Sequence, residues 1–95
     1  MIAIVAKHFI KEENIREAIR IAKEMVTETI ANDRGCLRYE LFIDRNNPNV
    51  IAFLEEWEDI EAIEAHKTKD HFTPRLAFLV EHAEKQRDVT QYIKA

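Results

Sequence analysis

The amino-acid sequence predicts an α+β fold of the ferredoxin-like, split βαβ type, with the order strand, helix, strand, strand, helix, strand. Segments rich in β-branched and aromatic residues alternate with helical patterns in that order, and turn-forming residues separate the two middle strands. The chain holds only one glycine and two prolines, so no stretch is typical of a flexible linker. We therefore expect one domain over residues 1–95.

The first third of the chain predicts a strand and a long helix. Residues 2–10 are rich in β-branched residues, and this segment is too short for a core helix and ends at charged residues. Asn14 with Glu17 three residues later is typical of a capping box. Apolar residues then recur at helical spacing up to Ile30, and the lone Gly35 stands where a helix ends in the left-handed conformation.

The remaining elements follow from turn and cap signals. Residues 36–44 and 50–58 are predicted strands, and the Asn-Asn-Pro-Asn sequence at 46–49 predicts a hairpin between them. Asp59 can cap a short helix that carries Ile63 and His66. After an interruption at 68–70, a helix is expected over residues 71–85, with Pro74 in its first turn. Residues 89–93 form the last expected strand. The helices then cover one face of a four-stranded antiparallel sheet.

Both faces of this sheet carry apolar side chains. On the second strand one face holds Leu37, Tyr39, Leu41 and Ile43, and the other holds Cys36 and Phe42. On the third strand Ile51, Phe53 and Trp57 oppose Ala52 and Leu54. Because helices can bury only one of these sets, we expect the other to pack against the sheet of an identical subunit, giving a homodimer.

Composition and charge exclude several functions. The net charge of −4, with basic and acidic residues interspersed, argues against nucleic acid as a partner. No apolar stretch reaches the roughly 20 residues that span a bilayer, and no signal peptide is visible, so we expect a cytoplasmic protein without membrane contact. The single Cys36 excludes an internal disulfide, and a glycine-rich nucleotide or phosphate loop is absent.

Histidines are the strongest candidates for chemistry, because an imidazole exchanges protons near neutral pH. His66 and His71 flank the predicted break in the second helical region. Their spacing differs from the i, i+4 spacing of a helical metal pair, so no metal site is expected. His8 lies on the Ile4, Ala6 and Ile10 face of the first strand. It would share a cavity with His66 if that face looks towards the helices.

The junction of the third strand and the short helix holds three glutamates around the only tryptophan. Trp57 can line a pocket or fill the core, and the sequence favours neither reading. A glutamate buried under a helix would have a raised pKa and could act as a base. More often, however, such a glutamate forms a structural ion pair, and Arg38 on the adjacent strand is an obvious partner. We therefore favour a structural role for these glutamates.

The combined pattern resembles the antibiotic biosynthesis monooxygenase (ABM) family over nearly the whole chain. The resemblance rests on Gly-Cys-Leu-Arg-Tyr-Glu-Leu at 35–41, Glu-Glu-Trp-Glu-Asp at 55–59, Glu-Ala-His at 64–66 and His-Phe at 71–72. It implies a dimeric α+β barrel. It also implies a monooxygenase that uses O₂ on a phenolic or quinol substrate without a metal or organic cofactor.

The resemblance also implies roles for particular residues. His66 or His71 would be the base that deprotonates the phenol. Trp57, Tyr39 and Phe72 would shape the cavity together with His8, while Arg38 or Glu56 would orient the phenol. The protein itself would bind the aromatic molecule, remove a proton and exclude water.

Two other branches of the family give alternatives. Members that process phosphorylated autoinducer-2 carry a segment similar to His-Lys-Thr at 66–68 followed by His-Phe at 71–72, which would suit isomerase-like chemistry on a phosphorylated ligand. Haem-degrading members use a histidine ligand at the position of Leu76, which cannot bind iron. A non-catalytic dimer that binds a small molecule is the third reading.

Overall fold

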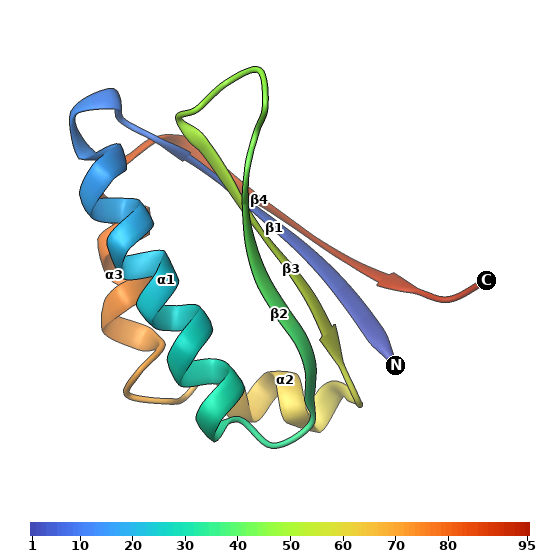
Figure 1. Cartoon of the computed structure of the whole chain (residues 1–95). Coiled ribbons are helices and arrows are strands. Elements are labelled where there is room, and N and C mark those ends of the chain that lie inside the picture. Colours follow the sequence, from blue (N-terminus) through green and yellow to red (C-terminus); the bar gives the residue numbers. More distant parts are fainter.

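The computed structural model describes residues 1–95 and has the ferredoxin-like topology that the sequence predicts (Figure 1). In chain order the elements are β1 (Ile2–Ile10), a 3₁₀ turn (Glu12–Asn14), α1 (Ile15–Asn32), β2 (Cys36–Ile43), β3 (Val50–Trp57), α2 (Ile60–His66), α3 (Thr73–Glu81) and β4 (Ala83–Ile93). The strands form one antiparallel sheet in the order β2-β3-β1-β4. All the helices lie on one face of it (Figure 1). None of these helices combines the length and the apolar character needed to cross a membrane.

Two of the predicted helix ends are confirmed and a third is not. Gly35 has φ +85°, and a Cβ added there would lie 2.6 Å from the Cβ of Ala62, so only glycine fits between α1 and α2. Asp59 caps α2, because its Oδ1 accepts from the Ala62 N–H at 2.9 Å. The capping box at Asn14 does not form: α1 continues directly from the 3₁₀ turn, and the Asn14 side chain makes no capping bond.

Two boundary predictions were wrong. The helix expected over 71–85 ends at Glu81, and β4 begins at Ala83 rather than at Val89, because residues from Ala83 onwards pair with the end of β1.

In β2 a register shift between Cys36 and Arg38 exposes Leu37 and turns the half-buried Cys36 towards the core, opposite Trp57. The predicted faces of these two residues are therefore exchanged.

The core lies between the helices and the covered face of the sheet. Its buried members from the strands alternate along the chain, as the period of a strand requires, and include Ile4, Ala6, Ile10, Tyr39, Phe53 and Trp57. From the helices come Ala18, Ala22, Met25, Ile63 and Leu79. Buried polar side chains stand among them, namely those of His8, Thr29, Asp33, Glu55 and His66. These polar groups define the region described next.

The opposite face of the sheet is open. Phe42, paired with Ala52, and Tyr92, paired with Ala3, point outwards and are about half exposed. Val5 and Leu54, which are paired with each other, lie on the same face between the Phe42–Ala52 pair and the Ala3–Tyr92 pair. Charged residues share this face, so it is a mixed surface with an apolar middle.

Candidate functional site

A cavity of about 370 Å³ lies between the helices and the covered face of the sheet. This volume is within the range typical of small-molecule sites. More than half of its lining residues are hydrophobic, including the aromatic side chains of Tyr39, Phe53 and Phe72. The polar side chains at its wall come from His8, Glu55, His66, Lys67, Thr73, Arg87 and Gln91. A mainly apolar chamber with aromatic walls and several polar groups fits a small aromatic ligand that carries polar substituents.

His66 is the last residue of α2 and is held from several sides. Its ring centroid lies 4.3 Å from that of Phe72 and 4.7 Å from that of Trp57. Nδ1 is hydrogen-bonded to the carboxylate of Asp33, while Nε2 makes no hydrogen bond within the chain. The aromatic contacts and the carboxylate therefore fix the orientation of the imidazole at the cavity wall.

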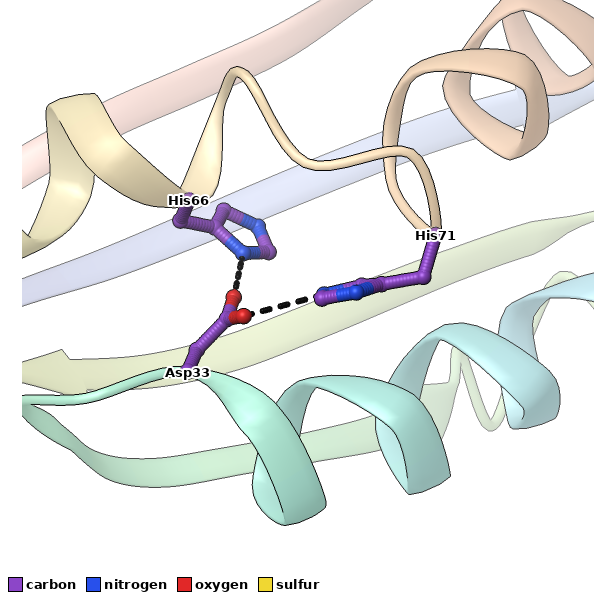
Figure 2. A group of neighbouring side chains, drawn as sticks. All are labelled: Asp33, His66 and His71. Carbon is purple, nitrogen blue, oxygen red and sulfur yellow. Dashed lines mark hydrogen bonds and ion pairs between the residues drawn. The ribbon is translucent and has the colours of Figure 1, made fainter.

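Asp33 joins the two histidines that the sequence singles out (Figure 2). It ends α1, and its side chain is only 1% exposed. One carboxylate oxygen bonds His66 Nδ1, and the other, Oδ1, lies 3.0 Å from Nε2 of His71. His71 stands in the connection between α2 and α3, whose turn brings it back towards α1 (Figure 2). Three segments of the chain therefore meet at one buried carboxylate.

The electrostatics of His66 favour its neutral form. Burial lowers its pKa from the ordinary value, and the bond to Asp33 opposes this shift without reversing it. When Nδ1–H donates its hydrogen bond to the Asp33 carboxylate, the lone pair of Nε2 is free. His66 is therefore arranged as a proton acceptor.

Glu55 lies on the sheet floor of the same cavity. Its Oε1 accepts from the Trp57 indole N–H at 2.8 Å. Burial raises the pKa of this carboxyl group to about 7, although the Trp57 bond and Arg87 both favour the ionised form. At neutral pH Glu55 can therefore either donate or accept a proton.

His8 lines the cavity from β1. Burial, assisted by Arg87, lowers its pKa to about 4, so the ring is neutral at pH 7. Its edge meets the ring of Phe53 at a centroid distance of 5.7 Å, and its buried Nδ1 has no hydrogen-bond partner. The expectation that His8 and His66 share one cavity is confirmed.

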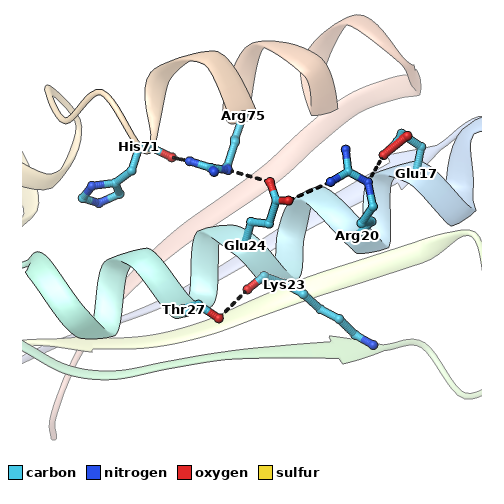
Figure 3. A network of polar contacts seen from close by, with 7 residues as sticks. All are labelled: Glu17, Arg20, Lys23, Glu24, Thr27, His71 and Arg75. Carbon is cyan, nitrogen blue, oxygen red and sulfur yellow. Dashed lines mark hydrogen bonds and ion pairs between the residues drawn. The ribbon is translucent and has the colours of Figure 1, made fainter.

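A chain of ion pairs fixes the segment that carries His71 (Figure 3). Arg75 donates from Nη1 to the carbonyl of His71 at 2.8 Å and from Nε to Glu24 on α1 at 3.1 Å. Arg20 binds the other oxygen of Glu24 at 2.7 Å and also pairs with Glu17. This network ties the start of α3 to α1 and so holds His71 beside Asp33.

The structure gathers most of the predicted site residues but not all. His8, Tyr39, His66 and Phe72 line the cavity. His71 lies behind His66, next to the other oxygen of Asp33. Trp57 is fully buried, donates a hydrogen bond to Glu55 and packs against the His66 ring. For Trp57 the packing alternative therefore describes its position.

Arg38 and Glu56 do not line the cavity. They lie on the open face of the sheet, paired with each other at 3.6 Å, because alternation along β3 directs Glu55 to the cavity and Glu56 away from it. The prediction that either residue orients a phenol therefore does not fit this cavity.

Sequence reasoning also missed Asp33, since a polar residue just before a helix-ending glycine carries no signal of its distant histidine partners.

The fold and cavity define a small α+β protein with a ligand-sized chamber under its helices. The chain belongs to the antibiotic biosynthesis monooxygenase (ABM) family, whose model matches residues 1–74. Family membership assigns it to the monooxygenase class of oxidoreductases. A comparison with curated proteins gives no match.

Solved structures agree with this assignment. A crystal structure described as an antibiotic biosynthesis monooxygenase is 30% identical, with a TM-score of 0.94, over 100% of this chain and 99% of that one. A conserved protein from Methanosarcina mazei Go1 is 31% identical, with a TM-score of 0.93, over 99% of this chain and 92% of its own. A Bacteroides thetaiotaomicron protein described as a possible oxidoreductase shares the fold at 24% identity and a TM-score of 0.88, over 96% and 94% of the two chains.

Proposed function

We propose that this chain is a cofactor-independent monooxygenase that oxidises a small phenolic or quinol-type molecule with O₂. One observation carries the proposal: a neutral imidazole, His66, is held by a buried carboxylate at the wall of an apolar, aromatic cavity of about 370 Å³. Such a cavity accepts a planar aromatic molecule, and such an imidazole accepts its phenolic proton.

The reaction needs no reductant besides the substrate. His66 Nε2 removes the phenolic proton, and the resulting phenolate is electron-rich enough to reduce O₂. A new bond then forms between a ring carbon and one oxygen atom, and the O–O bond breaks. The other oxygen leaves as water with two hydrogens from the substrate, so a hydroquinone and O₂ yield a hydroxyquinone and water. All electrons come from the aromatic ring.

Other cavity residues have supporting roles in this proposal. Tyr39, Phe53 and Phe72 provide aromatic surfaces against which a ring can stack. Glu55, whose pKa is about 7, can return a proton when the O–O bond breaks. The apolar lining keeps water from competing for the deprotonated substrate.

A second candidate function is isomerase-like chemistry on a small phosphorylated carbonyl compound. Lys67 and Arg87 both line the cavity, and two cations suit a phosphate group. Lys67 is, however, more than half exposed and pairs with Glu64 at 3.2 Å, and Arg38 lies on the other face. The aromatic lining therefore favours the phenolic substrate.

Oxygen uptake with a panel of hydroquinones tests the proposal. We expect His66→Gln to lower the rate by about 10²–10⁴-fold, the usual contribution of a general base. The matched control is His82→Gln, because His82 lies at the end of α3, outside the cavity.

Failure of every hydroquinone to consume oxygen above background would refute the monooxygenase proposal, as would an unchanged rate in His66→Gln. Binding of a phosphorylated sugar that is lost in Lys67→Gln would instead support the second candidate. Binding of an aromatic molecule without turnover would support a non-catalytic module.

We also propose that the chain works as a homodimer joined through the open face of its sheet. Phe42 and Tyr92 are about half exposed on this face, and the side chains of Val5 and Leu54 lie between them. In addition, a monomer of 95 residues buries only a modest fraction of the surface that its unfolded chain exposes. A second copy of this face would cover these side chains. Light scattering coupled to size-exclusion chromatography measures the mass, and a stable monomer contradicts the dimer.

A further inference from the structure

We propose that Asp33, His66 and His71 form a binding site for a divalent first-row transition-metal ion, with Zn²⁺ the best match. The proposal goes beyond the oxygenation chemistry, which needs no metal. It rests on the geometry of three side chains from three segments: the end of α1, the end of α2 and the connection before α3.

The ligand atoms are close enough to share one ion. One nitrogen from each histidine and a carboxylate oxygen of Asp33 lie within 4.8 Å of one another. Ligands bonded to zinc at about 2.0–2.1 Å lie roughly 3.0–3.4 Å apart. Asp33 Oδ1 and His71 Nε2, at 3.0 Å, already meet this spacing. Binding requires that the ion displace the proton in the His66–Asp33 hydrogen bond, and that the His66 imidazole and the carboxylate move to bring all three ligands to this spacing.

Two of these atoms are buried with unmet bonding capacity. Asp33 Oδ1 and His71 Nε2 are at hydrogen-bond distance, yet their alignment is not that of a hydrogen bond, and neither has another partner. Only two further buried side-chain atoms in the chain, on His8 and Thr29, are left unpaired in this way. A buried polar atom without a partner is costly, and an ion between the two would satisfy both.

The donor set selects the kind of ion. Two imidazoles and one carboxylate are typical of zinc and related transition metals, and three protein ligands leave a position for water. Mg²⁺ and Ca²⁺ prefer sites made of oxygen atoms, so they fit poorly. The sequence spacing of His66 and His71 excludes a metal pair on one helix. The break after α2 removes this objection, because it turns His71 back towards the same carboxylate (Figure 2).

An ion at this position would change the chemistry of His66. A metal on Nδ1 takes the place of the proton, so the remaining imidazole proton lies on Nε2, the nitrogen left free for the cavity. His66 would then donate a hydrogen bond instead of accepting a proton. This consequence rests on the proposed function, whereas metal binding does not.

Metal binding is tested on the untagged full chain. Zn²⁺ binding is measured by calorimetric titration. Co²⁺ binding is measured by visible absorption and by the quenching of Trp57 fluorescence. Trp57 is the only tryptophan, and its ring centroid lies 4.7 Å from that of His66. We expect one ion per chain and the absorption of nitrogen- and oxygen-coordinated Co²⁺. Asp33→Asn and His71→Gln should each weaken binding at least about tenfold, since even outer-shell changes at metal sites cost that much.

His71→Gln changes a connecting segment and so keeps the test valid if Asp33→Asn fails to fold. The controls His82→Gln and Cys36→Ser should bind the ion like the wild type. The proposal is overturned if neither ion binds, if His71→Gln binds as tightly as the wild type, or if a control variant loses binding. If the metal-free chain oxidises no hydroquinone although Zn²⁺ still binds in the titration, the proposed function alone is refuted.

Discussion

Two neighbouring glutamates on β3 show how the two faces of the sheet differ. Glu55 is 7% exposed, lies in the cavity, is bonded to Trp57 and has a pKa raised to about 7. Glu56, one residue later, lies on the open face and pairs with Arg38. Both residues have the same side chain and adjacent positions. Burial, and not residue type, therefore decides which of them can take part in proton transfer.

The largest expected difference between the faces is in core packing. Phe53 is 1% exposed and contacts His8 and Tyr39, so Phe53→Ala should lower the free energy of unfolding by about 3–5 kcal/mol. Phe42→Ala, on the open face, should instead weaken self-association. Urea unfolding measured at several protein concentrations separates the two effects. A concentration-independent loss of similar size for both variants would contradict the distinction between the faces.

The second difference is in the pH dependence of stability. The folded-state pKa of Glu55 is raised from 4.5 to about 7, so the folded state binds more protons, and stability falls as pH rises through this window. Glu55→Gln should therefore be more stable than the wild type at pH 8, by at most about 3 kcal/mol, and equal to it near pH 4. Urea unfolding between pH 4 and 8 measures the difference.

His8 gives this test an internal check. Its folded-state pKa is lowered from 6.5 to about 4, so it makes stability rise with pH between these values, opposite in sign to the effect of Glu55. In Glu55→Gln the contribution of His8 is no longer offset, and a steeper rise with pH should appear. If the stability difference between wild type and Glu55→Gln does not change with pH, Glu55 is not desolvated as the structure shows.

The smallest effect is expected for Glu56→Gln. Its ion pair with Arg38 is solvent-exposed, and such pairs contribute little because water and salt screen them. Unfolding in urea at low and high salt should show no change beyond experimental error at either. A clear, salt-dependent loss would mean that the open face is more enclosed than in the single chain, as it would be in a dimer.

The sequence was sufficient for the topology and for part of the site. Apolar periodicity, Gly35 and Asp59 gave the element order and two helix ends, since these signals act over a few residues. His66 and His8 could be proposed because imidazoles on apolar faces are chemically conspicuous. The start of β4 could not be predicted, since pairing with β1 overrides a local helical pattern there.

By itself, the sequence determined the α+β element order and made His8 and His66 candidate site residues, but it left open whether the face of β1 that carries His8 looks towards the helices. Tertiary structure alone decided that Asp33 is the carboxylate between His66 and His71, and that Glu55 rather than Glu56 faces the cavity. The physical reason is distance along the chain. Local signals fix local conformation, whereas a carboxylate at position 33 meets a histidine at position 66 only after the helices pack on the sheet. Burial then sets the protonation of the groups enclosed.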